Sequence, residues 1–340
     1  MANSALKTPG IATFLREQIL NLVQQEFPES RIVDTSVKRI NRGLEFVYQS
    51  AIALQLAALT GQNAFQIANL IDHRWRTGID QPETVPDMKN MKKRFRLEIQ
   101  PSGMMLFKLL PDGVADWLQT MTQDPQSNSF PNFEVASPTQ NQSQNPAQFA
   151  MIPLGRKNSK PGSTNFHSTN FHSTNFHSTK CSERSAKNIS RDWFYLQYSH
   201  ARCCSLLRLG HREGLIVLSQ PDPPVVPVLW SVVEPCPFPW LNRDHHLCFQ
   251  NAAEHEMITT LFTVLELRHC SSVSKAQWEK LARQLSQAFW VFYSQCQVLG
   301  EVKQGFPWLA QARLGLMLIA QSSSYFLLQE KLGICAPLEL

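Results

Sequence analysis

The sequence predicts an α-rich multidomain protein, with a small α+β domain at its N-terminal end and an all-α helical bundle at its C-terminal end. Three observations predict this architecture. Alternation of apolar and charged residues, typical of a half-buried strand, is confined to one stretch around residue 97. Long amphipathic helical patterns follow residue 191, and a segment poor in aliphatic residues separates the two regions. We therefore expect domains at 1–121 and 191–340, joined by a linker at 122–190.

The N-terminal region combines helical periodicity with two strand patterns. Apolar residues recur along one stripe in the first helix, and Gly61 is placed to end the second. The strand pattern Phe-Arg-Leu-Glu-Ile is followed after Gly103 by a second apolar run suited to a paired strand. The expected helices are Ile11–Phe27, Tyr48–Leu59, Asn63–Ile71 and Val114–Met121, and the expected strands are Phe95–Ile99 and Met104–Leu109.

The expected linker is rich in Gln, Asn, Ser and Pro, and the pentapeptide Ser-Thr-Asn-Phe-His recurs three times between 163 and 177. A segment of this composition buries too little apolar area to offset its chain entropy, so we predict disorder. The three evenly spaced histidines also suit a metal. A flexible tract offers no fixed coordination geometry, however, and we expect no metal here.

The C-terminal region predicts a bundle of long helices with short connections. Trp193–Leu209 is helical in pattern, whereas the seven prolines between 221 and 240 exclude a helix there. Three amphipathic helices follow at about 252–269, 274–294 and 306–332, the last ended by Gly333 as a C-cap.

Charge and cysteine content restrict the classes of function. The formal net charge is +5, and residues 191–340 carry 12 basic and 12 acidic side chains. An RNA-binding surface there must therefore be a local patch. The eight cysteines show no C-x-x-C spacing, the opening residues lack the apolar stretch of a secretory signal, and no run approaches a membrane span. We expect a cytoplasmic protein with reduced thiols and no membrane partner.

The C-terminal region resembles the anticodon-binding domain, often called the DALR domain, of class I arginyl-tRNA synthetases. Trp193–Arg202 reads Trp-Phe-Tyr-Leu-Gln-Tyr-Ser-His-Ala-Arg and is similar to the family's Tyr-Val-Gln-Tyr-Ala-His-Ala-Arg helix. Leu281–Leu299 resembles a bundle helix that ends in an aromatic pair, a Cys and Val-Leu. Arg313-Leu314 stands in the place of the family's Arg-Leu pair, and Leu332–Pro337 matches its closing Leu-Gly-Ile-x-Ala-Pro. The resemblance implies a helical bundle of the anticodon-binding type.

The N-terminal region resembles the same family's N-terminal additional domain. Ala51–Ile71 is similar to its helix pair, and Arg96–Leu109 to its strand-turn-strand. Leu106 stands where the family has the Asn that contacts the tRNA elbow, and Met104 stands in place of its Phe. The family's large catalytic domain, with its His-Ile-Gly-His-like and Lys-Met-Ser-Lys-Ser-like motifs, has no counterpart between the two regions. Lys157–Lys160 echoes the second motif only by chance, because no strand and helix are expected to hold it.

These observations predict a tRNA-binding, non-catalytic paralogue of arginyl-tRNA synthetase, with no catalytic residues and no cofactor. Two alternatives remain. The chain is a protein-interaction module, or it is a trans-acting part of an arginine–tRNA ligase whose catalytic chain is separate. The expected partners are tRNA, including arginine tRNA, and such a catalytic chain. Binding that is insensitive to salt and to RNA would favour the module, and ATP-dependent charging only with both chains present would favour the ligase.

The helix that starts at Trp193 carries the main candidate RNA-binding residues, which are Tyr195, Gln197, Tyr198 and Arg202. Tyr195, Tyr198 and Arg202 share one face, and aromatic rings beside a guanidinium suit stacking on unpaired bases and contact with phosphate. Alternatively, the tyrosines pack inside the bundle and Arg202 forms an ordinary ion pair. Trp290, Phe292 and Tyr293 are expected in the core. Arg313 either contacts the anticodon stem or fixes two helices.

The run Met88–Arg96 holds five cations in its last eight positions and predicts a phosphate-facing patch or a solvated loop. Its candidate tRNA-binding residues are Lys92, Lys93, Arg94 and Arg96. The only metal cluster that the folded regions suggest is His245, His246, Cys248 and His255. This spacing fits no standard zinc pattern, so we expect no metal site.

Overall fold

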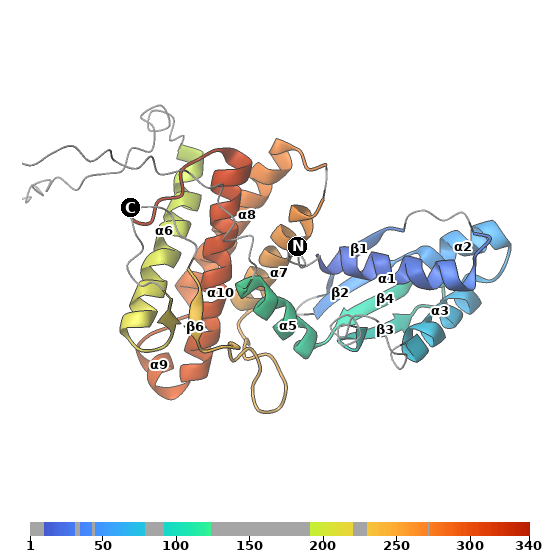
Figure 1. Ribbon diagram of the computed structural model, residues 1–340, viewed down its shortest axis with the longest axis horizontal. Coiled ribbons are helices and arrows are strands. Elements are labelled where there is room, and N and C mark those ends of the chain that lie inside the picture. Colours follow the sequence, from blue (N-terminus) through green and yellow to red (C-terminus); the bar gives the residue numbers. More distant parts are fainter. Residues whose placement is uncertain are drawn as a thin grey trace, which may run out of the picture. The chain divides into compact units, whose positions relative to one another are not determined.

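The computed structural model describes residues 10–30, 35–42, 45–78, 92–123, 191–219, 230–270 and 272–340 (Figure 1). The described part is rich in helices and contains one four-stranded sheet and one two-stranded sheet. None of its helices is both long enough and apolar enough to cross a lipid bilayer. The expected linker and its repeats lie outside the described residues, so disorder there stays a prediction.

Within its described residues, the N-terminal region contains the helices α1, α2, α3 and α5 and an antiparallel sheet in the order β1-β2-β4-β3. The strands are β1 (Val37–Arg42), β2 (Glu45–Ser50), β3 (Phe95–Ile99) and β4 (Met105–Leu109). The helices are α1 (Ile11–Glu26), α2 (Ile52–Thr60), α3 (Ala64–Gly78) and α5 (Pro111–Thr122). The apolar stripe of α1 is buried, and Phe14 of this stripe packs on Phe95 and Trp117. Gly61 ends α2 in the left-handed conformation, as the sequence predicts.

The expected helix Tyr48–Leu59 is wrong in its first turn, and β1 was not predicted at all. Tyr48 belongs to β2, where it lies opposite Arg39 of β1 and Phe107 of β4. Phe46, Val47 and Tyr48 are consecutive and all buried. A strand buried on both faces shows no alternation and cannot be distinguished by periodicity from the start of a helix. The helix itself begins only at Ile52.

Long helices dominate the C-terminal region. They are α6 (Arg191–Arg212), α7 (Ala252–Arg268), α8 (Lys275–Gln295) and α10 (Pro307–Tyr325), with the short α9 (Glu301–Gly305) before α10. Helix α6 packs against α8 and α10, and α7 packs against α8 and α10. Asn251 and Ser274 begin α7 and α8 with complete capping boxes, which satisfy backbone N–H groups that helix starts otherwise leave unpaired.

The expected helix 306–332 changes type near its end. From Phe326 to Leu332 the backbone is π-helical (η3), and Gly333 then adopts the left-handed conformation expected of a C-cap. Within the proline-rich stretch, the described residues include the strand β6 (Val232–Glu234), which pairs with β5 (Val217–Leu218).

The loop after β6 is fastened by α5 (Pro111–Thr122) and α10. The side-chain oxygen of Gln119 on α5 accepts hydrogen bonds from the Phe238 backbone at 2.9 Å and from the Trp240 indole at 3.0 Å. The Trp240 ring lies against Gly315 of α10, where a Cβ atom would come within 2.3 Å of it. A glycine is therefore required at this position of α10 for the ring to approach.

Helix α7 also contacts the four-stranded sheet. Arg39 of β1 donates to the Thr259 carbonyl at 2.8 Å and to the Thr263 hydroxyl at 2.6 Å. Tyr48 of β2 donates to Glu266 at 2.7 Å. Residues from both regions thus belong to one compact unit.

Candidate nucleic-acid interface: a groove between α6 and α8

The N-terminal half of α6 and the middle of α8 form a continuous series of aromatic rings. The Tyr198 ring stacks on Trp290, with centroids 5.1 Å apart and planes inclined by 13°. Phe194 lies 6.1 Å from Tyr198 on one side, and Tyr293 lies 6.2 Å from Trp290 on the other. Aromatic rings on two packed helices therefore form a single surface on which planar groups can stack.

Arg202 lies at the Tyr293 end of this series, and Arg283 lies over the neighbouring Trp193. Arg202 is centred 4.9 Å from the Tyr293 ring, and its Nε donates to the Tyr293 hydroxyl at 3.0 Å. Arg283 of α8 is centred 5.2 Å from the Trp193 ring and is exposed. Arg283 forms an ion pair with Glu279 one turn away at 3.8 Å, which is a weak surface pair. The Arg283 guanidinium is therefore available to an anionic ligand, whereas Arg202 is largely committed to α8.

A groove of about 870 Å³ opens beside these rings. Its walls include Trp193, Phe194, Tyr195, Arg283, Gln287 and Trp290. Tyr195 is 60% exposed, and the lining residues that the structure describes include one arginine and no carboxylate. Among the described groups, the Trp290 indole N–H is buried without a hydrogen-bond partner, an exception that proteins usually avoid. We name the groove formed by Trp193, Phe194, Tyr195, Arg283, Gln287 and Trp290 the aromatic groove.

The structure separates the predicted residues of α6. Tyr195 and Tyr198 lie at the aromatic groove or directly behind it, whereas Gln197 is buried and donates to the Cys335 carbonyl at 2.9 Å. Arg313 is also buried, and it pairs with Glu254 at 2.7 Å and donates to the Gln297 carbonyl. Both side chains connect elements inside the protein, so we do not include Gln197 or Arg313 in the candidate interface.

Lys92, Lys93, Arg94 and Arg96 also have different surroundings. Lys92 is buried, and Arg94 pairs with Asp112 at 3.5 Å and with Asp116 at 2.7 Å, which fixes it to α5. Lys93 and Arg96 are exposed, and neither forms an ion pair with another described residue. Residues 88–91 of the same run lie outside those residues. The exposed cations of this run are thus Lys93 and Arg96.

Sequence reasoning missed Trp193, Phe194 and Arg283 as groove residues and expected Trp290 and Tyr293 in the core. Only Phe292 of that aromatic group is fully buried, whereas Trp290 and Tyr293 are half-buried. The spacing of Arg283 and Trp290, seven residues apart, places them on one helix face and was a signal for the groove.

Two of the four residues that suggested a metal cluster, Cys248 and His255, contact backbone carbonyls instead. Cys248 Sγ lies 3.2 Å from the Pro239 carbonyl, and His255 Nε2 lies 3.2 Å from the Phe249 carbonyl. Within the described ranges, no group of three or more His, Cys, Asp or Glu residues could hold a metal ion.

Burial raises the pKa of Cys248 to about 11 and those of Cys204 and Cys296 to about 12, so these thiols are unreactive at neutral pH.

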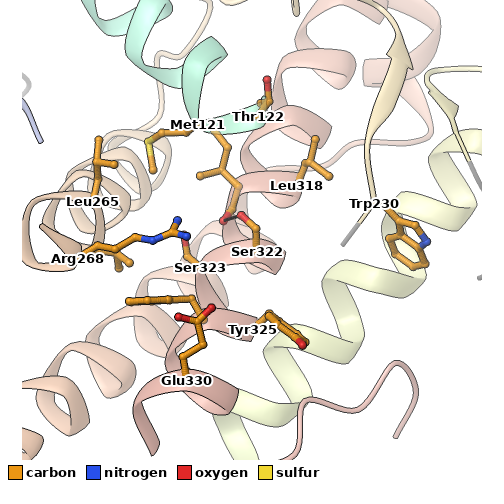
Figure 2. A pocket seen from close by; sticks show the side chains of 13 residues that line it. Met121, Thr122, Trp230, Leu265, Arg268, Leu318, Ser322, Ser323, Tyr325 and Glu330 are labelled. Atoms are coloured by element: carbon orange, nitrogen blue, oxygen red, sulfur yellow. Dashed lines mark hydrogen bonds between the residues drawn. The ribbon is translucent and has the colours of Figure 1, made fainter. Parts of the chain in front are cut away.

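A second hollow lies where α5, α7, α10 and η3 meet (Figure 2). Figure 2 shows Arg268 extending from α7 toward Ser323 of α10, with Glu330 below it. The hollow has a volume of about 40 Å³, which is room for a few water molecules but not for a nucleobase. Size therefore favours the aromatic groove as the ligand site.

The comparisons with known proteins indicate a distant relationship to arginine–tRNA ligases. The chain is 27% identical over 145 residues to the arginine–tRNA ligase of Synechococcus sp. (strain JA-3-3Ab), which covers 42% of this chain and 21% of the relative. It is 27% identical over 127 residues to that of Gloeobacter violaceus (strain ATCC 29082 / PCC 7421), covering 36% and 18%. The chain thus spans about a fifth of the length of these curated relatives. No protein-family model matches it, and no solved structure matches it. The chain is therefore similar to arginyl-tRNA synthetases over part of its length.

Proposed function

We propose that the chain binds transfer RNA and that the aromatic groove holds unpaired bases of that RNA. The observation that carries this proposal is the groove itself, in which two exposed rings of α6 and the half-buried Trp290 of α8 adjoin the exposed Arg283, with no carboxylate among the described lining residues. Bases that are not paired in a helix can be splayed out and stacked on aromatic side chains or on guanidinium planes. The groove offers both kinds of surface within one site.

The energetic case rests on stacking. Each base that stacks on an aromatic side chain contributes about 1–3 kcal/mol, and this contribution tolerates any base because every base has a π face. Phe194 and Tyr195 are exposed while their neighbour Tyr198 is held by Trp290. The held ring gives the exposed pair a rigid support, which lowers the entropic cost of binding.

The similarity to arginine–tRNA ligases supports tRNA as the RNA partner, with arginine tRNA as the first species to test. In this proposal the helices from α6 to α10 form a bundle of the anticodon-binding type, and the region 1–121 packed against them contacts the tRNA elbow. The exposed Lys93 and Arg96 would then contact phosphates.

We further propose that this chain does not charge tRNA by itself. Support comes from the short extent of the similarity, which covers only about a fifth of the curated ligases. A separate catalytic chain that uses this protein in trans is the second candidate function. It predicts ATP-dependent charging of arginine tRNA only when both chains are present.

Binding of purified full-length protein to total tRNA across a salt series tests the leading proposal. The variant Phe194→Ala/Tyr195→Ala removes the two exposed rings of the groove. The matched control is Phe306→Ala/Trp308→Ala, which removes an exposed aromatic pair of similar exposure before and at the start of α10. We expect at least tenfold weaker tRNA binding from the groove variant and unchanged binding from the control, because only the first pair lines the groove.

Arg283→Ala gives a second measurement on the same site. If Arg283 contacts a phosphate, its removal lowers the slope of log affinity against log salt by about one unit. Absence of saturable tRNA binding at low salt would overturn the proposal. An equal loss of tRNA affinity in the groove variant and the control variant would show that the aromatic groove is not the RNA-binding site.

A further inference from the structure

The cations of α8 all lie in its N-terminal half. Lys275, Lys280 and Arg283 are exposed there, and neither lysine forms an ion pair with another described residue. The only carboxylate of the helix is that of Glu279, which forms the weak pair with Arg283. From Gln284 to its C-terminal end, in contrast, α8 carries no charged residue. The helix therefore has a positive half and an uncharged half.

One exposed face of α8 connects the aromatic groove to the start of the helix. Arg283 and Gln287 line the groove, and Lys280 precedes them by three and seven positions. Residues at these spacings lie within about 60° of one another around a helix, so the three side chains share one face. Ala276 is exposed and lies one turn before Lys280 on the same face. This face thus runs from the groove to the first turn of α8.

We propose that an RNA strand bound in the aromatic groove leaves it along this face, with phosphates beside Arg283 and Lys280. This inference rests on the proposed function, in which the groove holds unpaired bases. Charge selects the direction, because phosphates meet cations in the N-terminal half of α8 and none in the other half. The face from Ala276 to Gln287 extends about 16 Å along the helix axis. A stacked strand has one phosphate per about 3.4 Å, so this length matches about four to five unpaired nucleotides.

The rings of the groove select RNA over an acidic peptide. Both ligands complement the cations of α8, but only RNA supplies planar bases for Phe194 and Tyr195, which are exposed. Bases inside a duplex are stacked on one another, so their faces are hidden from these rings. The groove and the positive half of α8 together therefore favour a single-stranded RNA segment.

Oligoadenylates of three and six nucleotides test this path, because only the longer one can fill the groove and also reach Lys280. Fluorescence anisotropy of the labelled oligonucleotides gives their affinities for the full-length protein across a salt series. For a single strand, each phosphate contact contributes about 0.7 to the slope of log affinity against log salt. We expect Lys280→Ala to lower the slope for the hexamer by about 0.7 and to leave the slope for the trimer unchanged.

Two variants that each add one carboxylate to an exposed position of α8 test the direction. Ala276→Glu adds it to the proposed path, and Gln295→Glu adds it at the uncharged end of the helix. Both lower the net charge equally, and a carboxylate in the first turn of a helix is favourable for its stability. We expect Ala276→Glu to weaken hexamer binding at least threefold and Gln295→Glu to leave it unchanged.

Equal effects of the two Glu variants, or an unchanged hexamer slope in Lys280→Ala, would overturn the path along α8. The groove would remain the base site in that case if Phe194→Ala/Tyr195→Ala still weakens tRNA binding. Absence of saturable hexamer binding would overturn the path alone, and absence of tRNA binding as well would overturn the proposed function with it. Binding of hexaglutamate as tight as that of the hexamer would replace RNA by an acidic peptide.

Discussion

His200 lies in the interior of the helical region, where its two ring nitrogens face different elements. Nδ1 is 2.8 Å from the Pro337 carbonyl, and Nε2 is 3.2 Å from the side-chain nitrogen of Gln321 on α10. In the neutral ring Nδ1–H donates to the carbonyl, and Nε2 accepts from the Gln321 amide. Burial lowers the pKa of His200 to about 4, and the Pro337 carbonyl only partly opposes this shift.

Stability should therefore fall in acid because of this residue. Above pH 6.5 the ring is neutral in both folded and unfolded chains, so His200 exerts no penalty. Between pH 6.5 and 4 the unfolded chain takes up a proton that the folded chain refuses, which lowers the free energy of unfolding by about 3 kcal/mol by pH 4. Urea unfolding at several pH values measures this loss.

The His200→Gln variant is the control for this effect. Its side chain cannot titrate, so the difference in stability between wild type and variant should shrink as the pH falls from 6.5 to 4. A difference that stays constant across that window would show that His200 does not cause the acid loss.

Residue type alone did not reveal which polar side chains of α6 face inward. Gln197 and His200 bind the C-terminal segment through the carbonyls of Cys335 and Pro337, and Arg208 binds it through Leu338 and Glu339. Tyr195, two positions before Gln197, is exposed. The helical period placed Tyr195, Tyr198 and Arg202 on one face. The helical period could not show that this face of α6 packs against α8, because that packing depends on contacts between residues about 90 positions apart.

The Trp240 ring packs closely against helix α10, and Gly315 allows this close approach. A Cβ atom at Gly315 would lie 2.3 Å from the Trp240 ring and 3.0 Å from Phe238. We expect Gly315→Ala to displace Trp240 from Gln119 and to lower the free energy of unfolding by about 1–3 kcal/mol. Chemical unfolding followed by far-UV circular dichroism measures the change.

Gly305 provides the matched position on α9. A Cβ atom there would meet nothing within 4 Å, and the backbone conformation is not left-handed. Gly305→Ala should leave the free energy of unfolding unchanged or raise it by about 0.4–1 kcal/mol. Similar losses in the two variants would contradict the packing argument for Gly315.

The sequence predicted elements well where a cap or a long amphipathic period defined them. Helices α7 and α8 match the expected ranges closely because Asn251 and Ser274 give recognisable starts. Strands β1 and β2 were not predicted, because Phe46, Val47 and Tyr48 lack alternation. The π-helical turn at Phe326 has no signature in the local pattern, which continues a helical period through it.

The molecule as a whole is tied together by contacts between the four-stranded sheet and α7. Arg39 and Tyr48 donate hydrogen bonds to Thr259, Thr263 and Glu266. Burial raises the pKa of Glu266, and its neighbours Arg39 and Tyr48 partly oppose this rise. The carboxylate is thus held in a poorly solvated place by one donor, the Tyr48 hydroxyl, and by the nearby charge of Arg39, and removing both leaves it without that support.

Wild-type protein should therefore unfold in a single cooperative transition. Arg39→Ala/Tyr48→Phe keeps the buried ring of Tyr48 but removes the donors, and we expect it to separate the transition into two. Tryptophan fluorescence reports on Trp75 and Trp117 of the N-terminal region among others, and circular dichroism reports mainly on the helices. Coincident transitions by both probes in the double variant would show that these contacts do not couple the regions.

Trp193 and Trp290 both line the aromatic groove, so the intrinsic tryptophan fluorescence of the protein reports on this groove. A planar ligand that enters the groove replaces water beside two indoles at once, so their emission changes with occupancy without any attached dye. Of the other tryptophans, Trp75, Trp117, Trp230, Trp240 and Trp278 are buried and supply a constant background, whereas Trp308 is exposed and lies outside the groove. The groove that we assign to RNA bases can therefore be monitored in the unlabelled protein during every titration described above.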